Sequence, residues 1–158
     1  MGLVLARVDQ RLVHGIVVTQ VVKDVNAKRI MVIDDLVSQD EDQKNIIRMS
    51  KPAGTGMSII NVETAITNIK AGKYDDHNVL IVVNSPKILL NLADAGIKLP
   101  KVQLGIVFDR EDREKLTKSV SLNDEEKNIV KELSSRGIEV VFQFTPNSKE
   151  EPLNKYVY

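Results

Sequence analysis

The sequence contains no cysteine and no tryptophan, and aromatic residues make up only 4% of its 158 residues. The lack of cysteine excludes disulfides, thiolate metal sites and a cysteine nucleophile. Few aromatic rings also leave few platforms on which single-stranded nucleic acid could stack. The two histidines, His14 and His77, are too few for a multi-histidine zinc site. We therefore expect no metal ion.

The sequence also has no excess of positive or negative charge and no long hydrophobic run. Lys plus Arg number 22 and Asp plus Glu number 22, so the net charge is zero. This balance argues against strong non-specific binding to nucleic acid or to an anionic membrane. No run of about 18 apolar residues is present that could span a bilayer. We expect a cytoplasmic protein that does not bind nucleic acid.

Short runs rich in β-branched residues recur along the chain and predict strands. Most are continuously apolar, which is typical of strands covered on both faces. They alternate with helical stretches, and no linker or repeat divides the chain. We predict a single α/β domain over residues 1–158, with an open, mostly parallel, doubly wound sheet and helices on both faces. The predicted strands are Leu3–Arg7, Arg29–Ile33, Met57–Asn61, Val79–Val83, Val102–Val107 and Ile138–Phe144.

Some helix boundaries are marked by capping residues, whereas other helices are indicated only by the spacing of apolar residues. Asn84–Pro86 offers a cap followed by proline, and Asn123–Glu126 resembles a capping box. Val37–Ser50 predicts one surface helix. Gly15–Val25 carries valines at helical spacing, although β-branched residues favour strands. The charged run Asp109–Lys118 predicts a solvated loop or a turn of helix.

The end of the first predicted strand gathers reactive side chains. The segment Arg7–Gly15 reads RVDQRLVHG and places an imidazole, two guanidiniums and a carboxylate within nine residues. Ligands of open α/β sheets bind outside the carboxyl ends of the strands, so a site is expected here. Gly15 permits a close backbone approach, and its N–H lies at the start of the next predicted helix.

These side chains fit phosphoryl transfer through a histidine. Arg11 and the helix N-terminus could hold a phosphate against His14, while Asp9 orients the ring. In the alternative interpretation, His14 only bonds to its loop and Arg11 pairs with Asp9. The residues alone leave both interpretations open.

Other polar groups are weaker candidates. His77 precedes a predicted strand, and we expect a surface histidine. Asp34 and Asp35 follow the second strand and could bind a metal or accept a phosphoryl group, as in response-regulator receivers. The third strand ends in Asn61–Glu63 without the receiver's aspartate, so loop structure or support of the His14 site is favoured. Lys51–Gly56 lacks the P-loop ending, and no dinucleotide motif follows the first strand, so we expect no cofactor.

The segment Arg7–Gly15 resembles a family signature, Arg-hydrophobic-Asp-x-Arg-hydrophobic-hydrophobic-His-Gly. It is typical of enzyme IIB of the mannose/fructose/sorbose family, a component of the bacterial phosphoenolpyruvate-dependent sugar phosphotransferase system. The resemblance covers nearly the whole chain. It continues at Asp35, Lys44, Pro52, Gly54, Asn84–Pro86, Gly105 and Arg136–Glu139.

The resemblance implies a phosphocarrier enzyme. His14 would accept a phosphoryl group, at its Nδ1 atom, from a phosphohistidine on enzyme IIA. It would pass the group to a sugar delivered by the membrane components IIC and IID, which would hold the protein at the inner face of the membrane. Arg11 would hold the phosphate and Asp9 would organise the loop. Further phosphate-binding or supporting positions are Gly15, Arg7, Asp35 and Lys44.

Three positions depart from the family pattern, and one of them is Gln43, with Lys44 beside it, where a further basic residue is often found near the start of the second helix. Ile16 stands where glutamine is common, and Ile106 replaces the second glycine of a Gly-Gly pair. These departures motivate a second hypothesis, a regulatory relative that accepts phosphate but signals to a protein. The third hypothesis is a non-catalytic α/β interaction domain.

Overall fold

A seven-stranded sheet with the order β3-β2-β4-β1-β5-β8-β9 forms the centre of the molecule in the computed structural model. The structure describes residues 2–158, but not the side chains of Ile16 and Val17. All neighbouring strands pair in parallel except β9, which runs antiparallel to β8. The strands are β1 (Gly2–Asp9), β2 (Arg29–Ile33), β3 (Gly56–Ile60), β4 (Asn78–Val83), β5 (Val102–Ile106), β8 (Val140–Phe142) and β9 (Glu151–Pro152).

The predicted fold class is confirmed, and each predicted strand coincides with a strand of the sheet. Strand β4 is buried at every residue after Asn78, and β5 at every residue, as expected for strands packed on both faces. The antiparallel edge strand β9 and a small hairpin, β6 (Glu114–Lys115) with β7 (Ser121–Leu122), were not predicted. Two-residue strands carry too little hydrophobic pattern to be recognised.

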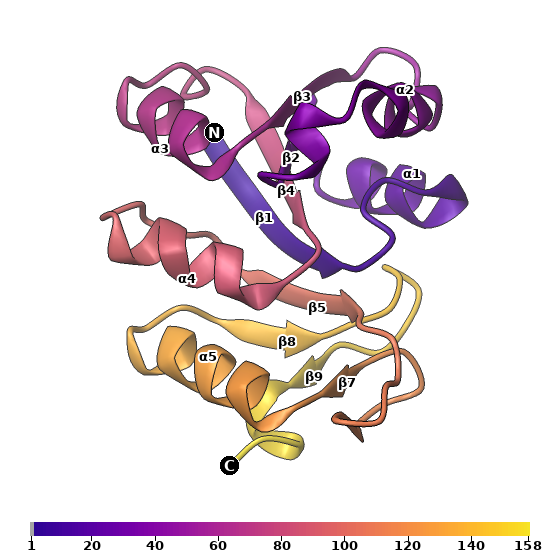
Figure 1. Cartoon of the computed structure of the whole chain (residues 1–158), viewed down its shortest axis with the longest axis vertical. Coiled ribbons are helices and arrows are strands. Elements are labelled where there is room, and N and C mark those ends of the chain that lie inside the picture. The colour runs from indigo at the N-terminus through magenta and orange to yellow at the C-terminus, as the bar shows by residue number, and fades with distance from the viewer. Residues whose placement is uncertain (1) are drawn as a thin grey trace.

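Helices cover both faces of the sheet (Figure 1). On one face, α1 (Gly15–Asp24) and α2 (Glu41–Met49) bury Val18, Val21 and Ile47 in a common apolar cluster. The helices of the other face are α3 (Val62–Lys70), α4 (Pro86–Asp94) and α5 (Asp124–Ser135), whose apolar side chains join a second, larger cluster. The last turn of chain is the 3-10 helix η2 (Leu153–Lys155).

The segment Gly15–Val25 is helical as predicted, and packing explains why. Val18, Val21 and Val22 lie on one side of α1 and are almost completely buried against the sheet. Tertiary burial of this stripe outweighs the modest strand preference of valine.

The prediction of one helix over Val37–Ser50 is wrong. The segment is divided into the 3-10 turn η1 (Val37–Gln39) and helix α2. Asp40 separates them with an extended backbone (φ −112°, ψ 100°), and its carboxylate accepts a hydrogen bond from the Gln43 N–H. This residue therefore works as the N-cap of α2, which is a common place for aspartate and a poor one within a helix.

The fold brings the loop after β1 to a topological switch point. From β1 the chain crosses to β2 through α1 on one face, whereas from the adjacent strand β4 it crosses to β5 through α4 on the other face. Connections that leave neighbouring strands toward opposite faces open a crevice at the carboxyl ends. The loop Gln10–His14 lies at this crevice, which is where the sequence predicts a site.

Candidate phosphate-accepting site

Asp9 is the buried anchor of the site. Its side chain is 1% exposed and accepts hydrogen bonds from the Arg7 Nε atom at 3.2 Å and from the Arg11 backbone N–H at 2.9 Å. The Arg11 Nε atom lies 3.7 Å from the same carboxylate. The backbone of Asp9 also accepts from the Leu12 N–H at 2.9 Å. One carboxylate thus fixes the strand end, the loop backbone and two guanidiniums.

Arg7 is completely buried beneath this loop. Its guanidinium donates to the Gln103 side chain at 2.7 Å, to the Phe144 carbonyl at 2.9 Å and to the Gln143 carbonyl at 3.3 Å. Burial lowers the pKa of Arg7 from its ordinary value, and the charge of Asp9 opposes that shift. Because arginine stays charged in proteins, Asp9 is the counter-charge that the buried guanidinium requires. Arg7 supports Asp9 from inside and does not face solvent.

Gly105 makes room for that guanidinium. A Cβ atom built at Gly105 would lie 2.2 Å from the Cζ atom of Arg7 and 2.4 Å from its Nη2 atom. Only glycine can occupy this position of β5 while Arg7 keeps its place. The first glycine of the resemblance therefore has a direct steric reason.

The loop presents His14 at the beginning of a helix. Leu12 adopts a left-handed conformation (φ 58°), as does Gly15 (φ 62°). His14 is exposed and occupies the N-cap position of α1, with extended backbone and no hydrogen bond from its side chain to the helix. No acidic residue lies in the first turn of α1. Unused N–H groups and the helix dipole make this end attractive to an anion.

Arg11 faces a cavity beside this loop. Its side chain is 30% exposed, and among the residues that the structure describes, its Nε and Nη2 atoms have no hydrogen-bond acceptor although both are buried. The cavity has a volume of about 320 Å³ and is also lined by Ile106, Lys118 and Phe144. Ile106 is 5% exposed and thus narrows the pocket at the position where the family has glycine. A guanidinium whose donors lack an acceptor can hold a phosphoryl group.

The structure places the remaining candidate residues farther along the sheet edge. Asp35 accepts a hydrogen bond from the Val62 N–H at the start of α3, and Asp34 accepts from two N–H groups of its own turn. These bonds confirm the loop-structure interpretation of the acidic pair. The Lys44 ammonium lies 3.3 Å from Glu41 on its own helix. No hydrogen bond or ion pair between described residues joins Asp35 or Lys44 to Asp9, Arg11 or His14.

His77 lies on the surface, as predicted, at the amino end of β4. Its Nδ1 atom is 2.7 Å from Asp76, and its ring packs edge-on against Tyr74. The side chain of His77 is 27% exposed.

Contacts of Gln10 with Phe108 and Arg113 also hold the loop after β1, and sequence reasoning did not find them. Gln10 accepts hydrogen bonds from the Phe108 N–H at 2.6 Å and from the Arg113 guanidinium at 3.2 Å. Arg113 also forms two hydrogen bonds, at 2.9 and 2.8 Å, with Glu126 of the α5 capping box. The run Asp109–Lys118 is a mostly exposed loop, as predicted, but it contains the short strand β6 and is anchored through Arg113. Gln10 and Arg113 are 103 residues apart, and no local spacing signals such a contact.

Within residues 2–158, no group of three or more His, Asp or Glu side chains is arranged to hold a metal ion. None of the helices that the structure describes is long and apolar enough to cross a membrane.

The chain is similar to known proteins in sequence and in fold. Residues 3–158 match the model of the family described as the PTS system sorbose subfamily IIB component. The sorbose-specific EIIB component of Klebsiella pneumoniae is 30% identical over 140 residues, covering 89% of this chain and 85% of that protein. The mannose-specific EIIAB component of Escherichia coli K12 is 30% identical over 136 residues, covering 86% of this chain and 42% of that protein.

A solved structure extends the match to the whole fold. The crystal structure of the IIBSor domain of the sorbose permease from Klebsiella pneumoniae superposes with a TM-score of 0.94 at 27% identity, covering 99% of this chain and 96% of that one. The family model and the superposed structure thus each match nearly the full length of this chain. The chain belongs to the sorbose subfamily of the IIB components of the sugar phosphotransferase system.

Proposed function

We propose that His14 is the phosphate acceptor of this IIB component. The observation that carries the proposal is an exposed imidazole at the start of α1, three residues after Arg11, whose Nε and Nη2 atoms have no hydrogen-bond acceptor among the described residues. The donor is a phosphohistidine on an enzyme IIA. The mannose-specific relative, which is named as a combined EIIAB component, supports a link to a IIA function.

The transfer takes two displacements at phosphorus. The lone pair of the His14 Nδ1 atom attacks the phosphorus, and the phosphorus–nitrogen bond on enzyme IIA breaks. A sugar hydroxyl oxygen then attacks the same phosphorus, the phosphorus–nitrogen bond to His14 breaks with its electron pair left on Nδ1, and the hydroxyl proton is released to solvent water. Such loose transition states need positioning and charge neutralisation more than covalent help. Arg11 and the N–H groups at the start of α1 supply the positioning and the charge neutralisation.

The remaining residues keep this arrangement in place. Asp9 fixes the loop backbone through the Arg11 N–H, and Arg7 holds Asp9 from below. Asp35 supports the neighbouring corner through the Val62 N–H. Lys44, whose side chain is 16% exposed, adds positive charge on α2. We propose that the sugar reaches the site through the membrane components IIC and IID, with the protein held at the inner face of the membrane.

A phosphorylation assay tests the acceptor. The protein is incubated with phosphoenolpyruvate, enzyme I, the phosphocarrier HPr and a mannose-family IIA, and acid-labile phosphate is measured. We expect one phosphate on the wild type, none on His14→Ala and an unchanged amount on His77→Ala. Full phosphate uptake by His14→Ala would overturn the proposal.

The cavity wall at Ile106 favours one alternative, the regulatory relative. An isoleucine at this nearly buried position leaves less space beside Arg11 than a glycine does. If the protein accepts phosphate but transfers none to any sugar in the presence of intact IIC and IID, the regulatory function replaces the transport function.

A further inference from the structure

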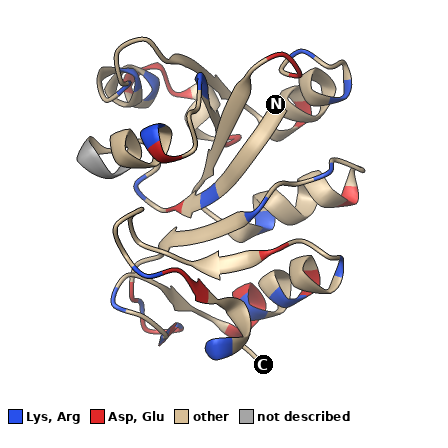
Figure 2. Ribbon diagram, turned by 180° about the vertical axis from the view of Figure 1, so that it is seen from behind, with Lys and Arg blue, Asp and Glu red and all other residues tan. Residues whose placement is uncertain are grey.

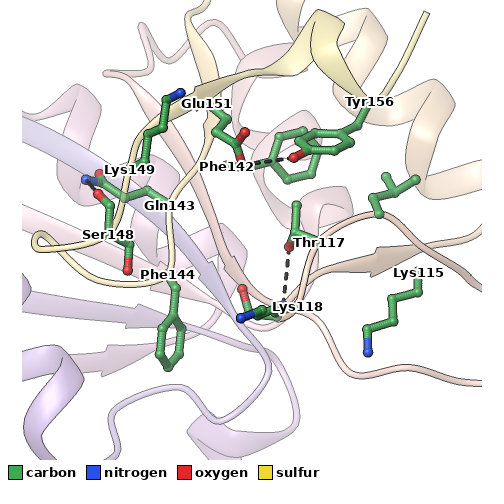
Figure 3. A pocket seen from close by; sticks show the side chains of 12 residues that line it. Lys115, Thr117, Lys118, Phe142, Gln143, Phe144, Ser148, Lys149, Glu151 and Tyr156 are labelled. Atoms are coloured by element: carbon green, nitrogen blue, oxygen red, sulfur yellow. Dashed lines mark hydrogen bonds between the residues drawn. The ribbon is translucent and has the colours of Figure 1, made fainter.

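A larger cavity opens next to the one that contains Arg11. It has a volume of about 900 Å³ and lies between the segment of the β6–β7 hairpin and the C-terminal segment around β9 (Figure 3). The two cavities share Lys115, Lys118, Ser119 and Phe144 in their walls, so they adjoin. A trough therefore runs from Arg11 of the phosphate loop toward Tyr156. The volume of the larger cavity is within the range of small-molecule sites.

The trough has an excess of basic side chains, although Asp109 lines the smaller cavity and Glu151 the larger one. Lys115, Lys118 and Lys149 line the larger cavity, and none of them forms an ion pair within 4.0 Å with a described residue. Glu151 is the acidic residue of that wall, and it is already bound by Lys155 and by the Tyr156 hydroxyl. Figure 2 shows basic and acidic residues close together over much of the fold. The excess of basic side chains in the trough favours an anionic ligand.

The walls also offer apolar and hydroxyl surface. Phe142 and Tyr156 pack edge-to-face with ring centres 5.1 Å apart, and Phe144 is 42% exposed. The Thr117 hydroxyl oxygen accepts from the Ser119 and Val120 N–H groups, which leaves its own proton to donate. In Figure 3, Thr117 and Lys118 lie on one side of the cavity, while Phe144 and Ser148 lie on the other.

We propose that this trough binds a phosphorylated monosaccharide. The phosphate group lies at the junction of the two cavities, between Arg11 and Lys118, and the sugar ring extends toward Phe144 and Thr117. A sugar ring matches these walls because it has an apolar C–H face together with hydroxyl groups. An inorganic phosphate could pair with the basic side chains, but it has no apolar surface that could pack against the aromatic rings.

The site has a consequence for phosphoryl transfer that rests on the proposed function. A phosphate at the junction uses the donors of Arg11 that the phosphoryl group on His14 also needs. A bound sugar phosphate therefore competes with phosphorylation of His14. Accumulated sugar phosphate would slow its own formation at this component.

Binding is tested on the unphosphorylated full chain by amide NMR titration and calorimetry. The probes are glucose 6-phosphate, glucose and inorganic phosphate. We expect glucose 6-phosphate to bind with a Kd of about 1 mM or tighter and at least about tenfold more tightly than the other two. Amide shifts should centre on Thr117–Ser119 and Phe144. No binding, or equal binding of inorganic phosphate, would overturn the proposal.

Variants locate the site and separate it from the proposed function. Lys118→Ala should weaken the binding of glucose 6-phosphate about tenfold, because a charge-assisted hydrogen bond is lost. Lys98→Ala is the matched control, since that exposed lysine lines a cavity at Gly2 and Leu3, at the other end of β1. Unchanged binding by Lys118→Ala would contradict the proposal. His14→Ala should keep its affinity, so binding survives in this variant even if His14 proves not to be the phosphate acceptor.

Discussion

The two histidines of this chain lie in opposite settings at opposite ends of the parallel strands. His77 has a carboxylate partner, Asp76, at 2.7 Å and lies at the amino end of β4. His14 has no such partner among the described residues and lies beyond the carboxyl end of β1, at the start of α1. A carboxylate contact alone therefore does not mark a functional imidazole.

The surroundings of the ring make the difference. His14 lies at a helix N-terminus, three residues after Arg11, whose buried Nε and Nη2 atoms have no acceptor among the described residues. Near His77, the charged neighbour is an aspartate, which hydrogen bonds to the ring and whose pKa is lowered by that bond. A negative neighbour repels phosphate. The same side chain thus suits phosphoryl transfer at one end of the sheet and a surface contact at the other.

The largest difference between the two histidine environments is expected when the neighbouring carboxylate of each is removed. Asp9→Asn leaves the guanidinium of Arg7 fully buried without a counter-charge, and we expect a loss of about 3–5 kcal/mol in the free energy of unfolding. Asp76→Asn is the control, because that side chain is 87% exposed, and it should leave the unfolding midpoint unchanged. Urea denaturation measures both. Equal stability of the two variants would show that Asp9 does not anchor the loop.

Removing the guanidinium next to His14 should affect rate and not stability. Arg11→Gln is expected to slow phosphorylation by IIA about 100-fold, since the charge that stabilises the transferring group is lost. The midpoint of unfolding should stay close to that of the wild type, because this side chain forms only a 3.7 Å approach to Asp9. Arg136→Gln, at the distant end of α5, is the matched control for rapid-quench kinetics. A rate equal to that of the control would exclude a direct role for Arg11.

Two glycines that lie under arginines give the mildest test. Gly105→Ala forces a methyl group to within 2.2 Å of the buried Arg7 Cζ atom, and we expect a loss of about 1–3 kcal/mol. Gly56→Ala meets the Arg29 guanidinium at 3.0 Å, at the end of a less buried side chain that can move aside. Its cost should be clearly smaller in thermal unfolding. If both variants lose equal stability, the close packing of Arg7 under β5 is not the reason for glycine at this position.

Much of the fold and the core of the site could be predicted because their signals are local. The buried strands are continuous apolar runs, and Asp9, Arg11 and His14 occupy one short loop whose position at a strand end follows from the fold class. The helix α1 was predictable from the spacing of its valines. The predicted helix over Val37–Ser50 is interrupted at Asp40, because the side chain of this residue caps α2. The hydrophobic pattern alone does not show this interruption.

The supporting contacts could not be predicted, because they join distant parts of the chain. Arg7 binds Gln103 and the Phe144 carbonyl, which are 96 and 137 residues away. Gln10 is held by Arg113, whose charged neighbourhood predicts only solvated loop. These partners are set by tertiary packing and leave no periodic pattern in the sequence.

On the proposed function, the setting of each ring, and not the residue type, selects His14 over His77 for phosphorylation. The most direct measurement is mass spectrometric mapping of the singly phosphorylated protein, digested at neutral to mildly basic pH after reaction with phosphorylated IIA. We predict that the phosphate is found on the peptide that contains His14 and that the peptide with His77 is unmodified. Phosphate on His77, or on both peptides in comparable amounts, would contradict the account.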